Sequence, residues 1–347
     1  MKKLLDSRYS YSSTRNIVQM SSESLAARDA FISKYSGIDA MKPQSCYVCS
    51  NEKMRVISEI DRYGFYYPTA VCDRCGNVQQ SEYYTEDVLT DFYSNSYRKI
   101  YGNTEPQELF EAQRKGKGID IFKFVSSVCK PRSVLEVGCG AGGILSIFQK
   151  NGSEVTGLDF DEDYLSVARQ NGIKAVTGSL DQLSSNDKYD LIILSHVLEH
   201  ITEPAIFLGK LIEHLEDDGV IYIEVPSLNN VSEGGGGYRY DLLRYWQNAH
   251  TMHFTVKTLN LLCKKVGLVN IKQTNFIHSC WNKAVLAKEI TSKDMADTLS
   301  DTLKLLSKIE IRRKGFRAKL IGFRHVVLRL LALIGIKGFI KSIYYRG

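Results

Sequence analysis

Four of the eight cysteines have a spacing that suits metal binding. Cys46 and Cys49 form one C-x-x-C pair, and Cys72 and Cys75 form a second pair after a spacer of 22 residues. Each pair can present two thiolates from one tight turn, and two such turns complete a tetrahedral zinc site. Because four protein ligands leave no open coordination position, the spacing predicts a structural zinc ion. Dithiol redox chemistry is the alternative, although it requires only one of the two pairs.

A glycine-rich turn is the second feature that suits ligand binding. Gly138, Gly140 and Gly142 follow an apolar stretch that carries Glu136, and Asp159 ends the next apolar stretch. Glycines let the backbone turn sharply and approach a ligand, and a carboxylate at the tip of the second strand can bind a ribose diol. The third glycine is out of register for a dinucleotide fingerprint, and an acid precedes the first glycine by two residues. These features favour S-adenosylmethionine over NAD or FAD; a purely structural turn is the alternative.

Candidate acid–base residues follow an apolar stretch further along the chain. His196, Glu199 and His200 have i, i+3, i+4 spacing, so on a helical turn they would share one face. That face would suit an acid–base pair or a metal site. The alternative is that the segment only seals a strand–helix junction.

A second pair of histidines, His250 and His253, lies in a loop before a predicted helix. Upstream, residues 233–238 read Glu-Gly-Gly-Gly-Gly-Tyr and could form a flexible lid over an acceptor. The alternative for His253 is that it anchors the start of the helix. The two histidine segments make His200, His250, Glu199 and His253 the candidate catalytic residues.

The elements that must position these residues alternate between strand and helix. Apolar stretches predict strands at residues 133–137, 154–158, 190–194 and 220–225, and amphipathic stretches predict helices at 163–171, 203–215 and 255–266. This alternation predicts a Rossmann-like α/β fold, a doubly wound parallel sheet with helices on both faces. Two further strands are expected at 268–276 and 280–287, and one helix at 22–35.

Five regions are expected along the chain. They are a polar N-terminal arm (1–44), a zinc-binding ribbon (45–81), an aromatic connector (82–114), the α/β domain (115–289) and a basic helical tail (290–347). Lysines and arginines punctuate apolar residues in the tail, which is the pattern of cationic amphipathic helices. Such helices suit an anionic membrane surface; packing on the protein itself or on a dimer partner is the alternative.

The overall composition is that of a globular protein, with 44% hydrophobic and 24% charged residues. A net charge of +6 gives no reason to expect nucleic-acid binding. The N-terminus lacks the apolar core of a signal peptide, and no run reaches the roughly 18 apolar residues of a membrane span. Paired cysteines of this kind suit a reducing compartment, so a cytoplasmic location is expected, with the tail as a candidate contact to the inner membrane surface.

Four ordered motifs resemble those of class I S-adenosylmethionine-dependent methyltransferases. They are E-V-G-C-G-A-G, G-L-D-F, D-L-I-I-L-S-H-V-L-E-H-I-T-E-P and D-D-G-V-I-Y-I-E-V-P, and the resemblance covers roughly residues 115 to 285. It implies that Glu136 lies near the methionine amine and that Asp159 holds the ribose hydroxyls. It places Phe160 on the adenine face. The other positions implied at the cofactor are Gly138, Gly140, Gly142, Ser179, Leu180, Ser195 and His196.

The four-cysteine module, the Glu-His pair after the fourth strand and the later histidine segment also resemble bacterial deoxysugar C-methyltransferases and methyltransferases of surface-glycan gene clusters. In the deoxysugar enzymes, histidines that match His200 and His250 are acid–base groups. Ala249 stands where those enzymes have glutamate, and this chain has a helical tail where they have a second α/β domain. These departures favour O-methylation of a sugar hydroxyl, on a nucleotide-sugar or a glycan. The alternatives are a quinone or secondary metabolite as acceptor, or RNA, which the balanced charge of residues 46–75 disfavours.

Overall fold

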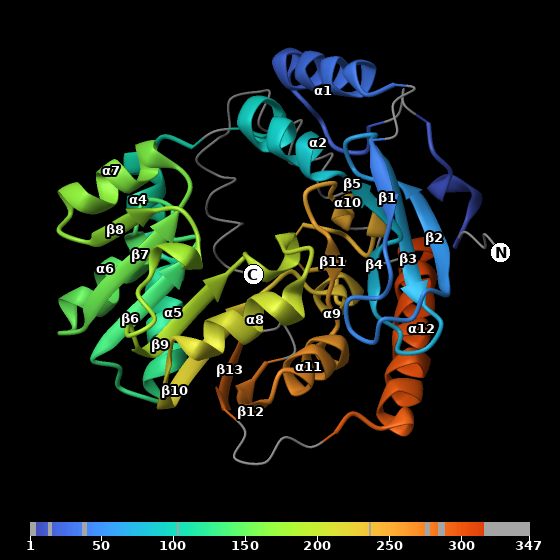
Figure 1. The fold of residues 1–347 in the computed structure, drawn as a ribbon. Coiled ribbons are helices and arrows are strands. Elements are labelled where there is room, and N and C mark those ends of the chain that lie inside the picture. Colours follow the sequence, from blue (N-terminus) through green and yellow to red (C-terminus); the bar gives the residue numbers. More distant parts are fainter. Residues whose placement is uncertain are drawn as a thin grey trace.

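The computed structural model describes residues 5–12, 16–36, 40–102, 104–235, 237–274, 278–283 and 289–315. Its largest element is a seven-stranded sheet of order β12-β13-β10-β9-β6-β7-β8 (Figure 1). The five strands from β10 to β8 run parallel, whereas β13 is antiparallel to both of its neighbours. The predicted α/β fold with a doubly wound sheet is confirmed. The strands are β6 (Ser133–Val137), β7 (Glu154–Asp159), β8 (Lys174–Thr177), β9 (Tyr189–Ser195), β10 (Leu215–Glu224), β12 (Leu268–Gln273) and β13 (His278–Lys283).

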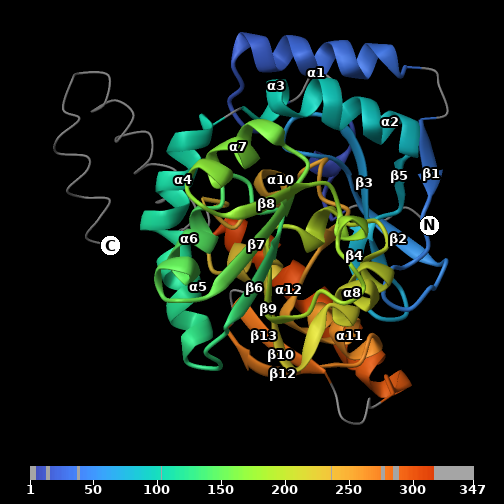
Figure 2. The same ribbon diagram turned by 60° about the vertical axis from the view of Figure 1, so that its left-hand side comes forward.

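Helices cover both faces of this sheet, which explains why its central strands are continuous apolar runs. Successive side chains of β6 enter different cores: Val134 packs with α5, α6 and α7, and Leu135 packs with α8 and α11. The covering helices are α4 (Pro106–Lys115), α5 (Lys117–Ser126), α6 (Gly143–Lys150) and α7 (Glu162–Gln170) on one face, and α8 (Pro204–Glu213) and α11 (Val256–Lys265) on the other (Figures 1 and 2). Phe110 of α4 lies in the same core as α6, so the sheet domain begins before the expected boundary at residue 115.

The four-cysteine region forms a smaller antiparallel sheet of order β11-β4-β3-β2. Three of its strands come from the predicted ribbon: β2 (Met54–Ile60), β3 (Tyr66–Cys72) and β4 (Val78–Gln80). The fourth, β11 (Met252–His253), comes from the α/β domain and pairs with Gln79 and Val78. The prediction of a ribbon confined to residues 45–81 therefore needs correction, because a distant segment completes its sheet.

The predicted N-terminal arm packs on this small sheet and on the aromatic connector. Helix α1 (Ser22–Lys34) lies within the predicted range 22–35, and Ser21 caps it. Phe31 of α1 packs against Phe65 and Phe92 in a shared aromatic core. The remaining elements of the two regions are η1 (Ser7–Tyr9), β1 (Met41–Pro43), β5 (Glu82–Tyr84), α2 (Glu86–Asp91), η2 (Phe92–Ser96) and α3 (Tyr97–Tyr101).

The last described helix, α12 (Ser292–Lys314), begins at a capping box formed by Thr291 and Asp294. Leu306 and Ile309 of α12 pack against the small sheet, and α12 also contacts α9 (Leu228–Ser232). The short helices η3 (Leu180–Gln182), η4 (Leu198–His200) and α10 (Leu242–Tyr245) complete the fold. Most of the predicted basic amphipathic segment, residues 316–347, lies outside the described residues. Among the described residues, no helix has the length and apolarity needed to cross a membrane.

Candidate functional site

The glycine turn lies between β6 and α6, at the carboxyl edge of the large sheet. Gly138, Gly140 and Gly142 all have positive φ angles, of 71°, 53° and 80°, which glycine adopts without strain. A Cβ atom on Gly138 would lie 2.7 Å from the Val197 side chain, and one on Gly142 would lie 2.6 Å from Ile173. The turn therefore requires glycine at these positions, because side chains of neighbouring segments occupy the space that a Cβ atom on Gly138 or Gly142 would need.

Asp159, at the end of β7, is tied to this turn. Its Oδ2 accepts a hydrogen bond of 2.8 Å from the Gly140 amide, and its Oδ1 accepts one of 3.0 Å from the Asp161 amide. Burial raises the pKa of the Asp159 carboxyl. Each carboxylate oxygen retains a second lone pair, so the side chain can still accept the two hydroxyls of a ribose.

Glu136 lies in β6 with almost no exposed surface, and its Oε2 is buried without a hydrogen-bond partner among the described residues. Burial raises the pKa of this carboxyl well above its usual value. A buried, unpartnered oxygen is costly unless a ligand supplies a donor, and a cationic amine would do so. The residue thus fits the methionine amine of S-adenosylmethionine, and this assignment stays a prediction.

Residues around Asp159 have surfaces that suit an adenosine. Phe160 exposes 78% of its side chain directly after the carboxylate, which is unusual for so large an apolar residue. Ser179 and Leu180 lie at the start of η3, where the Ser179 hydroxyl donates to Asp181 over 3.1 Å.

His196 bridges two carboxylates at the ends of β9 and β10. Its Nδ1 lies 3.2 Å from Glu199 Oε1, and its Nε2 lies 3.3 Å from Glu224 Oε1. Ser195 donates to Glu224 Oε2 over 2.8 Å, and Lys117 lies 3.5 Å from the same carboxylate. Burial lowers the pKa of His196, but the bonds to the two carboxylates outweigh it and raise that pKa to about 9. His196 is therefore a cationic link near neutral pH.

The predicted helical face of His196, Glu199 and His200 is not formed. His196 has a left-handed backbone with φ of 59°, and η4 follows as a 3-10 turn rather than an α-helix. The turn places His200 next to His250, whose ring lies 4.9 Å from that of His200 in an edge-to-face arrangement.

Glu199, His200 and His250 form a second cluster of acid–base groups, next to the one centred on His196. One ligand atom from each lies within 4.8 Å of the others. His200 Nδ1 lies 2.9 Å from the Ala249 carbonyl and donates to it, which leaves Nε2 as an acceptor. Burial lowers the pKa of His250 well below its usual value. The cluster can accept a proton, and its donor set could also hold a divalent cation.

His253 is not part of this cluster, and its ring is buried. Its side chain has no exposed surface, and its Nε2 lies 2.7 Å from the Tyr67 hydroxyl. Burial lowers the pKa of His253 to about 3, so the ring is neutral. An acceptor cannot reach a ring in this position, which corrects the prediction that His253 is catalytic; the residue anchors β11 instead.

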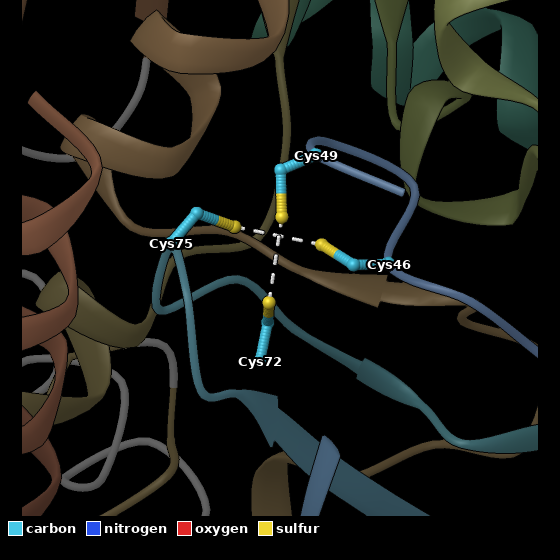
Figure 3. Close-up of side chains that lie close together, drawn as sticks. All are labelled: Cys46, Cys49, Cys72 and Cys75. Carbon is cyan, nitrogen blue, oxygen red and sulfur yellow. Dashed lines mark hydrogen bonds between the residues drawn. The ribbon is translucent and has the colours of Figure 1, made fainter. Parts of the chain in front are cut away.

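The four cysteines converge as the spacing predicts. Figure 3 shows the four sulfur atoms directed toward one point. The Sγ atoms of Cys46 and Cys75 lie 3.5 Å apart, as do those of Cys49 and Cys72. Sulfur atoms at about 2.3 Å from a tetrahedral zinc ion would be separated by about 3.8 Å, so the arrangement fits this metal. The other cysteines lie apart from the cluster, at positions 129, 139, 263 and 280.

Several site residues were missed by the sequence analysis. Glu224 is the eighth residue of the motif D-D-G-V-I-Y-I-E-V-P and ends strand β10, so its place at a strand end was a usable signal. Lys117, Tyr67 and Gln80 had none, because only the tertiary fold brings them to the histidines or to Glu224.

Comparison with known proteins agrees with this geometry. A family described as a methyltransferase domain matches residues 105–273. The ubiquinone biosynthesis O-methyltransferase of Rickettsia canadensis is 30% identical over 96 residues, which cover 26% of this chain and 41% of that protein. Its counterpart in Hydrogenovibrio crunogenus is 27% identical over 119 residues, or 32% of this chain and 49% of that protein. The chain thus spans less than half the length of these curated relatives.

Solved structures are similar only at a low level. DesVI of Streptomyces venezuelae is 24% identical with a TM-score of 0.31, covering 35% of this chain and 56% of that one. The plantazolicin methyltransferase BpumL, solved with SAH, is 18% identical with a TM-score of 0.41, covering 62% and 88%. Scores this low carry no argument about function. The motifs, the sheet and the family match agree, and the chain carries an S-adenosylmethionine-dependent methyltransferase domain preceded by a four-cysteine module.

Proposed function

We propose that the protein transfers a methyl group from S-adenosylmethionine to a sugar hydroxyl, on a nucleotide-sugar or a growing glycan. The observation that carries the proposal is the pairing of His200 with His250 at the carboxyl edge of the sheet, beside the turn that bears Glu199. A sugar hydroxyl is a weak nucleophile at neutral pH and benefits from a positioned base. The resemblance to sugar methyltransferases supports the same acceptor.

The cofactor side of the site would be held by residues described above. Glu136 would bind the methionine amine, Asp159 the ribose, and Phe160 the adenine face, with Ser179 and Leu180 at its border. S-adenosylmethionine, when bound, supplies the methyl group, which the acceptor oxygen takes as the carbon–sulfur bond breaks. The glycines at 138, 140 and 142 and the segment Ser195–His196 would line this part of the site.

On the acceptor side, His200 would act as the general base. Its Nδ1–H is fixed by the Ala249 carbonyl, so the lone pair of Nε2 is held in one direction. The hydroxyl proton moves to this Nε2 as the oxygen–methyl bond forms. His250 stays neutral and lies edge-to-face with His200, and Glu199 would stabilise the imidazolium that results.

A second candidate is O- or C-methylation of a small molecule that is not a sugar, such as a quinone. The observation that favours it is the sequence similarity to two proteins named ubiquinone biosynthesis O-methyltransferase.

We also propose that the four-cysteine module holds a structural zinc ion. We further propose a peripheral membrane contact through the basic tail.

The test uses methyl-labelled S-adenosylmethionine with the purified protein and fractionated extract of the source cells. Nucleotide-sugars, lipid-linked glycans, RNA and free metabolites are assayed separately for label. Label in either sugar fraction supports the proposal, and label in the lipid-linked fraction would also support the membrane contact. Label confined to RNA or to non-sugar metabolites would refute the sugar acceptor.

A further inference from the structure

The loop that bears His250 receives many of its hydrogen bonds from the four-cysteine module. The His250 carbonyl accepts one hydrogen bond of 2.5 Å from the Tyr67 hydroxyl and one of 2.7 Å from the Gln80 side-chain amide. The backbone amide of Gln80 donates to the Thr251 carbonyl over 3.1 Å. Tyr67 and Gln80 belong to strands β3 and β4, which lie on either side of the second cysteine turn, Cys72–Cys75.

The hairpin between β2 and β3 holds the beginning of the same loop. The buried carboxylate of Asp61 accepts a hydrogen bond of 2.9 Å from the Asn248 amide, and the Arg62 amide donates to the Trp246 carbonyl over 3.1 Å. Asp61 also accepts from the amides of Tyr63 and Phe65, so the hairpin itself is fixed. The loop is therefore attached to the module at its beginning, at His250 and along β11.

The other side of the loop contacts the turn that bears the proposed base. The Thr251 amide donates to the Glu199 carbonyl over 2.7 Å, and the Ala249 carbonyl accepts from His200 Nδ1. A displacement of the loop would move His250 and would also release the hydrogen bond that fixes the His200 ring. The glycine turn is held differently: the amides of Gly138 and Cys139 donate to the Leu158 carbonyl within the large sheet.

From these contacts we propose that the four-cysteine module positions the acid–base pair of the active site, with Tyr67 and Gln80 as the positioning residues. The proposal rests on the function proposed above for His200 and His250. Tyr67 is central because its hydroxyl donates to the His250 carbonyl and accepts from His253 Nε2. The module then acts on the acceptor half of the site and leaves the cofactor half unchanged.

The test compares Tyr67→Phe with Tyr9→Phe in the full chain. Both hydroxyls are hydrogen-bonded on fully buried rings, but the Tyr9 hydroxyl bonds to Glu310, whereas that of Tyr67 bonds to the His250 loop. The long-range ¹H–¹⁵N imidazole spectrum of the seven histidines reports their tautomers and surroundings, and His250→Gln and His253→Gln assign two of them. Calorimetry measures the affinity for S-adenosylmethionine, and zinc content and thermal unfolding check the fold.

In Tyr67→Phe, the signals of His250 and His253 should shift and kcat should fall by about tenfold or more, because small misplacements of catalytic groups are costly. The affinity for S-adenosylmethionine should stay within about twofold, and Tyr9→Phe should leave the imidazole spectrum unchanged. If Tyr67→Phe does not fold, Gln80→Met removes the second bond to the His250 carbonyl and is read in the same way. The His253 ring bonds directly to the Tyr67 hydroxyl, so its signal shifts in either case. An unchanged His250 signal would overturn the proposal.

The spectroscopic result stands even if no sugar acceptor is methylated. Unlabelled sugar fractions together with shifted imidazole signals would refute the sugar acceptor and keep the positioning role. Labelled sugar fractions together with an unshifted His250 signal would support the sugar acceptor and refute the positioning role.

Discussion

Replacement of Asp159 by asparagine tests the assignment of the cofactor site most directly. The two carboxylate oxygens accept from different backbone amides, those of Gly140 and Asp161. An asparagine has only one oxygen, so its NH2 group must face one of these N–H donors. A buried donor left without an acceptor costs about 1–3 kcal/mol, and the free energy of unfolding should fall by that amount.

The effect on the cofactor follows from the same geometry. The variant loses one charged acceptor for the ribose, and a hydrogen bond to a charged group contributes about 1.5–3 kcal/mol. Taking about 2 kcal/mol, the dissociation constant for S-adenosylmethionine should rise about 30-fold. Isothermal titration calorimetry measures this constant, and urea denaturation measures the stability.

Asp190→Asn is the matched control. Asp190 lies near the start of β9, whereas Asp159 ends β7. At Asp190 a single oxygen, Oδ2, accepts from the amides of both Arg132 and Ser133, at 2.7 and 3.1 Å. An asparagine oxygen can keep both bonds, so this variant should bind S-adenosylmethionine as the unmodified protein does. The ribose assignment is refuted if Asp159→Asn binds the cofactor with unchanged affinity. It is also refuted if the control weakens binding to the same extent.

Three further outcomes are expected. In His200→Ala, kcat should fall by about 10²–10⁴-fold because the base is lost, whereas the affinity for S-adenosylmethionine should stay unchanged because the cofactor contacts remain. Normal turnover of this variant in the methyl-transfer assay would contradict the role of His200. In Cys75→Ser, the zinc measured by atomic emission should be lost and the unfolding temperature should drop. The control variant Cys129→Ser changes a half-buried cysteine outside the cluster and should retain the metal. Burial lowers the pKa of His253 to about 3, and an unfolded histidine has a pKa near 6.5. The unfolded chain therefore binds the extra proton, so stability should fall as the pH drops from about 6.5 toward 3, by up to about 1.4 kcal/mol per pH unit. Urea denaturation of the unmodified protein and of His253→Gln at pH 7, 6 and 5 measures this loss, and an equally steep loss in both would exclude His253 as its source.

The elements of the large sheet could be predicted because their signals are local. Strand β6 matches the predicted range 133–137, since a short apolar run bounded by turn residues has few alternatives to a buried strand. Helix α1 begins at Ser22 because Ser21 supplies an acceptor for its first free amides. The glycines at 138, 140 and 142 all adopt the positive φ that their residue type permits. The cysteine pairs likewise specify their own turns.

The acid–base cluster depended on longer-range structure. The spacing of His196, Glu199 and His200 suggested one helical face, but the backbone at His196 is left-handed and η4 is a 3-10 turn. Spacing alone does not reveal this, because the bonds from His196 to Glu199 and Glu224 join the ends of two separate strands. The pairing of His200 with His250 likewise joins two loops that are distant in sequence.

The sequence by itself determined the fold class, the glycine turn, its acidic partner and the four-cysteine site, because each depends on backbone preferences and spacings within a short segment. Only the tertiary structure decided that β11 completes the sheet of the module, that His253 is buried, and that Tyr67 and Gln80 hold the His250 loop. Strand pairing and burial between distant segments depend on how whole elements pack, and no local pattern encodes that packing.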